Sequence, residues 1–120
     1  IATGTRLINH DGGVWILRKE HPNLNVFGKI VIGDNVFIGI DCILLPGTEI
    51  GENSILGAGS VVRGKIPDNS VVMGNPAKVI MKTSFAEKLM LTSKNRIDTK
   101  QLSKEREKEI ILEHFLNQLQ

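Results

Sequence analysis

The sequence has 120 residues, enough for one ordinary domain and too few for two well-buried ones. Its 15 basic and 13 acidic residues leave a net charge of +2, which indicates neither a nucleic-acid partner nor a membrane-surface partner. The most apolar stretch, residues 30–46, is interrupted by Asp34, Asn35 and Asp41, so no membrane-spanning helix is predicted. Cys42 is the single cysteine, which excludes an internal disulfide and favours a reducing, cytoplasmic setting.

The first residues open in the middle of a repeating pattern. Ile1 and Leu7 each begin a six-residue unit, and no Met or signal-like segment precedes them, so we expect an upstream part to be missing. The pattern then loses phase, because the step from Leu7 to Val26 is not a multiple of six. We therefore expect an extruded loop at about residues 11–25. Loops on rigid scaffolds are where binding groups concentrate.

A six-residue ladder dominates the middle of the chain. An aliphatic residue stands at every sixth position: Ile32, Ile38, Leu44, Ile50, Leu56 and Val62. Four residues after each of the first five stands a small or β-branched residue: Val36, Cys42, Thr48, Ser54 and Ser60. Three residues after each of the same five aliphatic residues stands a type that tolerates a left-handed backbone: Asn35, Asp41, Gly47, Asn53 and Gly59. A β-sandwich imitates two or three such steps, but three agreeing columns predict β-coils of three six-residue segments, stacked on one another.

The ladder ends in turn-rich sequence. Residues 66–70 form a turn cluster, residues 71–73 are a short apolar run, and the stretch Gly74-Asn75-Pro76-Ala77 breaks the pattern. We expect the coil to end there. The predicted domains are therefore residues 1–82, which form the coil and its loop, and a helical extension over residues 83–120.

Two helices are predicted in this extension. Ser84 followed by Glu87 is a capping-box signature for a short helix that ends at about Leu91. A second, amphipathic helix is predicted within residues 98–120. Its apolar face carries Leu112, Phe115, Leu116 and Leu119. We expect this face to pack on the same chain or on a partner subunit.

Two strings carry a resemblance to a known family: IGDNVFIGIDCILLPGTEIGENSILGAGSVV and IPDNSVVMGNPAKVI. They resemble the hexapeptide-repeat acyltransferases, in particular the branch of galactoside, maltose and capsular-polysaccharide O-acetyltransferases. The resemblance covers roughly residues 1–82. It implies a mainly β fold, a left-handed parallel β-helix, with the C-terminal α-helices outside the match. It also implies acetyl-CoA as co-substrate, a sugar or polysaccharide-precursor hydroxyl as acceptor, and a homotrimer with its sites between subunits.

The resemblance places the family's catalytic histidine just before the long loop, at His10. An alcohol must lose a proton as it attacks a thioester, and imidazole suits that general-base task. The family transfers the acetyl group directly, in a ternary complex. Asn9 is the neighbouring candidate for a side-chain amide that donates to the oxyanion. The ladder alone indicates a solvated histidine at a corner of the coil; the catalytic role is what the resemblance implies.

The family's CoA contacts map onto Ile40, Ala58, Arg63 and Lys78. Small residues at positions 57–59 let a pantetheine arm lie close to the backbone, and Arg63 and Lys78 are suited to phosphates. The chain departs from the family pattern at Arg63, where relatives often have Thr or Ser, and at Ile40, where a small polar residue is common. From the residues alone, the glycines are equally coil corners and Lys78 a solvated lysine.

Two loop residues are candidates for acceptor binding. Trp15 is suited to stacking on a sugar ring, although a lone tryptophan equally anchors its own loop. His21-Pro22 resembles the His-Pro of serine acetyltransferases, so a serine acetyltransferase-like enzyme stays open, as does a non-catalytic β-helix assembly module. A γ-type carbonic anhydrase needs three histidines on zinc, and the chain has only His10, His21 and His114, the last on the terminal helix. We predict no metal site.

Overall fold

The computed structural model describes residues 1–120, which divide into two compact units, Ile1–Lys88 and Leu89–Gln120. The strands are β1 (Arg6–Leu7), β2 (Val31–Ile32), β3 (Phe37–Ile38), β4 (Ile43–Leu44), β5 (Glu49–Ile50), β6 (Ile55–Leu56), β7 (Val61–Val62), β8 (Lys65–Ile66), β9 (Ser70–Gly74) and β10 (Ala77–Lys82). The helices are the 3₁₀ helix η1 (Gly12–Leu17) and the α-helices α1 (Thr83–Leu91) and α2 (Lys104–Gln118). None of the helices is long and apolar enough to cross a membrane.

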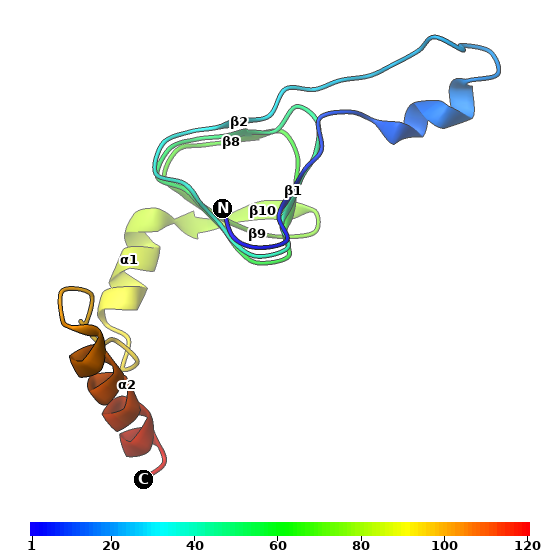
Figure 1. Cartoon of the computed structure of the whole chain (residues 1–120). Helices are drawn as coiled ribbons and strands as arrows, with labels where there is room; N and C mark the ends of the chain where they lie inside the picture. The colour runs from blue at the N-terminus through cyan, green and yellow to red at the C-terminus, as the bar shows by residue number, and fades with distance from the viewer. The chain divides into compact units, whose positions relative to one another are not determined.

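The strands stack in three sheets that form the three sides of a triangular coil (Figure 1). The sheet orders are β1-β4-β7, β2-β5-β8 and β3-β6-β9, with β10 added to the last. Val31 pairs in parallel with Glu49, and Phe37 with Ile55, in each case three six-residue units further along the chain. These pairings confirm the stacked β-coil of three six-residue segments per turn.

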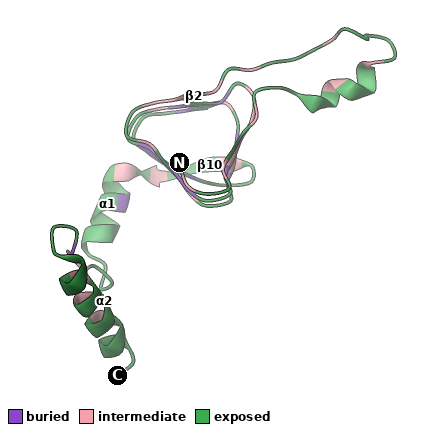
Figure 2. Cartoon of the chain, viewed as in Figure 1, coloured by how far each residue is buried: buried purple, intermediate pink, exposed green.

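The two predicted interior columns fill this coil. Ile38, Leu44, Leu56 and Val62 are fully buried, and so are the small residues Cys42, Thr48 and Ser60 (Figure 2). The hydroxyls of the small column do not stay unpaired, because Oγ1 of Thr48 and Oγ of Ser60 each donate to a backbone carbonyl at 2.6 Å. Burial of a hydroxyl costs little when it is hydrogen-bonded in this way. The five predicted corners all have a positive φ: Asn35, Asp41, Gly47, Asn53 and Gly59.

The last coil departs from the repeat. Glu49 pairs with Lys65, where three full units would bring it to Pro67, so this coil is shorter than the one before it. The chain then reverses: β9 and β10 pair antiparallel around Asn75-Pro76, whose peptide bond is cis. The sequence predicted the break at residues 74–77. It did not predict the return strand, because the apolar run before the break says nothing of the direction taken after it.

Both predicted helices are present, but Ser84 is the second residue of the first helix and not its cap, and the second helix is shorter than predicted. The first ends at Leu91, as expected, and begins at Thr83. The second begins at Lys104, because Oγ of Ser103 caps it by accepting from the backbone N–H of Arg106 at 3.2 Å. Its apolar residues are each more than half exposed: Leu112, Phe115, Leu116 and Leu119. The packing of this face on a partner subunit stays a prediction.

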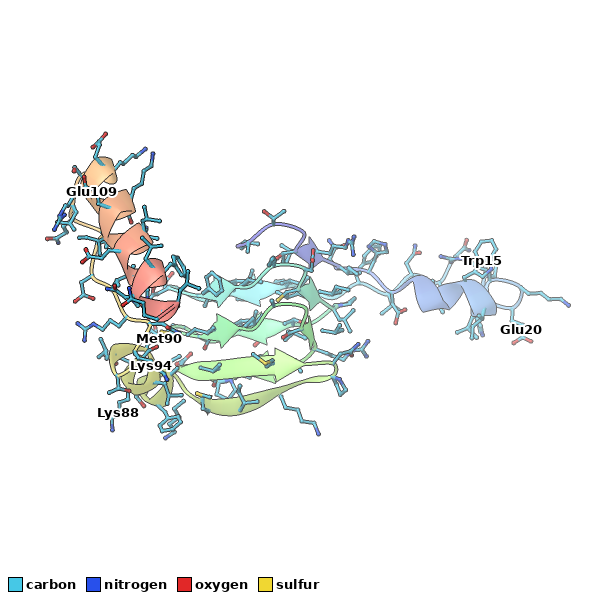
Figure 3. The ribbon with its side chains drawn as sticks, turned by 90° about the horizontal axis from the view of Figure 1, so that it is seen from below. Trp15, Glu20, Lys88, Met90, Lys94 and Glu109 are labelled. Carbon is cyan, nitrogen blue, oxygen red and sulfur yellow. The ribbon has the colours of Figure 1, made fainter.

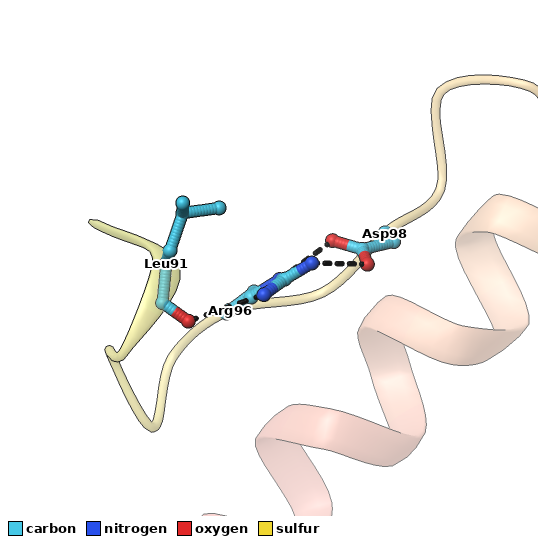
Figure 4. Close-up of polar contacts among 3 residues, drawn as sticks. All are labelled: Leu91, Arg96 and Asp98. Atoms are coloured by element: carbon cyan, nitrogen blue, oxygen red, sulfur yellow. Dashed lines mark hydrogen bonds and ion pairs between the residues drawn. The ribbon is translucent and has the colours of Figure 1, made fainter. Parts of the chain in front are cut away.

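Arg96 organises the segment between α1 and α2 (Figure 4). Its guanidinium makes two hydrogen bonds to the Asp98 carboxylate, from Nε to Oδ1 at 3.0 Å and from Nη2 to Oδ2 at 2.9 Å. Nη1 also donates to the carbonyl of Leu91 at 3.2 Å. The hydrogen bonds, and secondarily the opposite charge, hold the pKa of Asp98 below its ordinary value and that of Arg96 above.

Candidate functional site

The extruded loop leaves the coil between β1 and β2. The strands from β2 to β7 start at every sixth position, whereas β1 starts at Arg6 and β2 only at Val31. The neck of the loop is closed by two backbone bonds, from the N–H of Asp11 to the carbonyl of Val26 at 2.9 Å and from the N–H of Gly28 to the carbonyl of Asn9 at 2.8 Å. Beyond the neck, the loop projects from the stacked coils with Trp15 on its short helix (Figure 3).

His10 lies in this neck, where it faces Phe27 in an antiparallel bridge. Its side chain is exposed, and Nδ1 lies 3.1 Å from Oδ1 of Asn9. The amide oxygen is an acceptor only, so the contact is a hydrogen bond when Nδ1 carries the imidazole proton. In that tautomer Nε2 is the ring nitrogen with a free lone pair. The structure therefore presents a histidine whose partner orients it to accept a proton through Nε2.

A hollow of about 190 Å³ opens beside His10 on the loop side. Its walls are aromatic, aliphatic and polar: His10, Asp11, Gly12, Val14, Trp15, Arg18, Asn25, Val26 and Phe27. Trp15 and Phe27 remain 78% and 72% exposed, so both rings are available to a ligand. A ring face of this kind packs against the apolar face of a sugar, while amide and imidazole groups meet hydroxyls.

Phe27, Asn25 and Arg18 also line this hollow, although none of them was predicted as a site residue. The loop neck is the signal that would have found Asn25 and Phe27, since residues that re-enter a coil must lie beside those that leave it. No such signal selects Arg18. His21 lies outside the hollow. It stands at the far turn of the loop, where its N–H donates to the carbonyl of Leu17 at 2.7 Å.

Three of the four predicted CoA contacts follow a different edge of the β-helix. Ile40 and Ala58 are exposed at equivalent corners, after β3 and after β6, and the N–H of Gly59 donates to the carbonyl of Ile40 at 2.8 Å. The backbone is tightly packed there, because a Cβ added at Gly39 would lie 2.7 Å from the nitrogen of Ala58. Lys78 extends the same sheet on β10, where it pairs with Met73.

Arg63 lies at the corner of His10 instead. Arg63 follows β7, and the loop follows β1. Because β7, β4 and β1 stack in one sheet, Arg63 lies at the same corner as the start of the loop, two coils away. The sheet β1-β4-β7 therefore separates His10 and Arg63 from Ile40, Ala58 and Lys78. Within one chain, His10 and Arg63 are therefore not brought together with Ile40, Ala58 and Lys78. No three side chains of the types His, Cys, Asp or Glu are gathered where they could hold a metal ion.

Comparison with known proteins identifies the family of this chain. The family model of bacterial transferase hexapeptide (six repeats) matches residues 29–64. Protein CapG of Staphylococcus aureus is 46% identical over 115 residues, which make up 96% of this chain and 66% of CapG. The chain belongs to the bacterial hexapeptide-repeat transferase family. Like other members of this family, it folds as a left-handed parallel β-helix, with C-terminal helices in addition.

Two solved members of the family superpose well on the chain. A galactoside acetyltransferase in complex with coenzyme A has a TM-score of 0.69 and 34% identity, over 82% of this chain and 49% of its own. A hexapeptide-repeat acetyltransferase of Vibrio cholerae, complexed with acetyl-CoA, has a TM-score of 0.58 and 28% identity, over 65% of this chain and 42% of its own. The chain thus spans about two thirds of CapG and half or less of these solved relatives.

Proposed function

We propose that this chain is the β-helical part of an O-acetyltransferase, which moves an acetyl group from acetyl-CoA to a hydroxyl of a sugar or polysaccharide precursor. The observation that carries the proposal is His10 in the loop neck, paired with Asn9 through Nδ1 and bordering a hollow with two exposed aromatic rings. Support comes from the solved relatives, whose structures contain coenzyme A or acetyl-CoA.

The proposed reaction is a direct transfer. Nε2 of His10 removes the proton from the acceptor hydroxyl while the hydroxyl oxygen attacks the thioester carbonyl. The carbon–sulfur bond then breaks, and the imidazolium returns the proton to the departing thiolate sulfur. Asn9 orients the imidazole through its amide oxygen, so its amide nitrogen is the group left to donate to the oxyanion.

The acceptor is proposed to occupy the hollow beside His10. Trp15 stacks on the sugar ring, because its exposed indole faces this hollow from η1. His21, at the far turn of the loop, stays a proposed acceptor contact outside the hollow.

The acetyl-CoA is proposed to follow the corners of Ile40 and Ala58. Gly39 and Gly57 let the chain pack closely at these corners, because a side chain at either position would collide with neighbouring atoms of the β-helix. The pantetheine arm has amide groups that pair with exposed backbone N–H and C=O groups. Lys78 and Arg63 are proposed to contact its phosphates.

A complete site then requires a second copy of the chain, because His10 and the corners of Ile40 and Ala58 lie on different edges of the β-helix. We propose a homotrimer in which each site is shared by adjacent subunits. One subunit supplies His10, Arg63 and the loop. Its neighbour supplies Ile40, Ala58 and Lys78.

The test is an acetyl-transfer assay on the full protein that carries this chain, with acetyl-CoA and a panel of sugars, nucleotide sugars and serine. We expect transfer to a sugar hydroxyl and a loss of about 10²- to 10⁴-fold in kcat for His10→Ala, with an unchanged circular dichroism spectrum. His114→Ala, which removes a histidine of α2, is the matched control and keeps its activity. Wild-type rates in His10→Ala would refute the mechanism.

The panel also separates the alternatives. Transfer to serine alone identifies the serine acetyltransferase-like enzyme. A protein that neither binds CoA nor transfers acetyl to any acceptor is the non-catalytic assembly module.

A further inference from the structure

The extruded loop has no core of its own. None of residues 11–25 is buried, so apolar packing contributes little to its conformation. Its backbone bonds beyond the neck are short-range turns, such as that from the N–H of His21 to the carbonyl of Leu17. Another interaction must hold the outgoing limb, which contains η1, beside the returning limb at residues 22–25.

The side chain of Arg18 supplies that interaction. Its Nη1 donates to the carbonyl of Pro22 at 3.1 Å and to the carbonyl of Leu24, and its Nη2 donates to Oδ1 of Asn25 at 2.8 Å. No other side-chain hydrogen bond links the two limbs. Only guanidinium presents a planar fork of donors able to reach three oxygens at once, and a charged donor strengthens each bond.

The residues that Arg18 contacts come directly before the neck in the sequence. Asn25 precedes Val26, whose carbonyl accepts from Asp11, and Phe27 follows opposite His10. Arg18 and Asn25 also line the hollow beside His10. Residues 25–27 form one wall of the hollow, and His10 and Trp15 lie on the opposite wall. The guanidinium therefore holds the two walls at a fixed separation.

We propose that Arg18 is a positioning residue that sets the affinity for the acceptor by holding this wall of the hollow in place. The inference rests on the proposed function. Arg18 does not take part in proton transfer, since its donors point to oxygens of the loop itself. Loss of the guanidinium loosens the acceptor site and leaves both the acetyl-CoA contacts and the base intact.

The kinetic test compares Arg18→Ala with Lys19→Ala, which removes the same charge from the next residue, an exposed one. Arg18→Ala is expected to raise the acceptor KM about tenfold, the effect of losing charge-assisted hydrogen bonds. The KM for acetyl-CoA and the shape of the pH profile of kcat stay the same. Arg18→Lys restores little, because an ammonium group lacks the fork. Added guanidinium ion lowers the acceptor KM of Arg18→Ala only.

Trp15 provides a readout that needs no activity. It is the only tryptophan of the chain and stands three residues before Arg18, so its fluorescence anisotropy reports the order of the loop. We expect a lower anisotropy in Arg18→Ala, an unchanged one in Lys19→Ala, and the same circular dichroism spectrum in both.

The two proposals fail in distinguishable ways. Absence of acetyl transfer by the wild-type protein refutes the proposed function, whatever the anisotropy shows. A wild-type protein that transfers acetyl, with an unchanged acceptor KM or an unchanged Trp15 anisotropy in Arg18→Ala, overturns the role of Arg18. An equal rise in the KM for acetyl-CoA overturns it as well, since a general loss of structure would then be the cause.

Discussion

Asn35 and Asn53, which occupy the same corner of successive coils, are joined through their side chains: Nδ2 of Asn35 donates to Oδ1 of Asn53 at 2.8 Å. The two backbones adopt nearly the same left-handed conformation, with φ values of 52° and 53°. Each asparagine thus turns the chain at its own corner and ties that corner to the next coil. Residues that are three repeat units apart in the sequence thus contact each other in the structure.

Asn53→Ala is predicted to destabilise the β-helix by about 1–2 kcal/mol, because alanine keeps the Cβ that strains a left-handed conformation and loses the amide group that compensates through its hydrogen bond. Asn53→Gly removes the same side-chain bond without that strain, so it should cost less. Urea denaturation of both variants measures the difference. Equal losses of stability would show that the hydrogen bond, and not the backbone conformation, determines the choice of residue.

Gly39→Ala is predicted to lower the free energy of unfolding by about 1–3 kcal/mol, the usual cost of overpacking. A Cβ there would lie 2.7 Å from the nitrogen of Ala58 and 2.9 Å from the oxygen of Leu56, both of which are backbone atoms that cannot swing away. Gly12→Ala is the matched control, since its Cβ would meet nothing within 4 Å. Thermal unfolding should separate the two variants clearly. Similar melting temperatures would contradict the close stacking of the coils.

Complementation between inactive variants tests the shared site. His10→Ala and Ala58→Trp are each expected to be inactive, the first through loss of the base and the second through obstruction of the proposed CoA corner. Co-expression should restore about a quarter of the wild-type activity, because each randomly mixed trimer regains one intact pair of neighbours. No recovery in purified mixed trimers would mean that each chain builds its site alone.

The pKa of Asp98 is predicted to lie below its ordinary value because of the two hydrogen bonds from Arg96. A carboxyl whose pKa is lowered in the folded chain stabilises it at neutral pH, and this contribution is lost as the pH falls through the lowered pKa. NMR titration should show the Asp98 pKa rising toward its ordinary value in Arg96→Ala. Arg106→Ala, which breaks only the pair with Glu109, should leave it unchanged.

Much of the fold could be predicted from the sequence, because in a β-helix one period sets the interior, the corners and the pairing together. The aliphatic column, the small column and all five corners were found where expected. The return strand β10 was not, since it depends on where the chain packs after Asn75-Pro76, and a local pattern does not encode that. The shortened last coil was missed because it lies beyond the last anchor of the ladder, Val62.

The candidate site was predicted less completely. The loop followed from the loss of phase and the choice of His10 from the family resemblance, but the separation of His10 from Ile40 and Ala58 followed from neither. The spacing of these residues in the sequence already contained this separation, since Ile40 and Ala58 are three six-residue units apart and so lie at the same corner. Arg63 stands the same three units after Leu45, on the other edge. The contacts of Arg18 depend on how the loop folds back, which no period describes.

The outermost strand, β10, has a further consequence for the behaviour of the protein in solution. An exposed strand edge is a template on which other molecules add strands, and a coil of identical layers would invite copies to stack end to end. Here the edge runs antiparallel to β9, its register shifts between Val79 and Met81, and it carries Lys78 and Lys82. Irregular, lysine-bearing edges resist such addition. The strand that ends the coil thereby protects the edge of its own sheet against end-to-end addition of further copies.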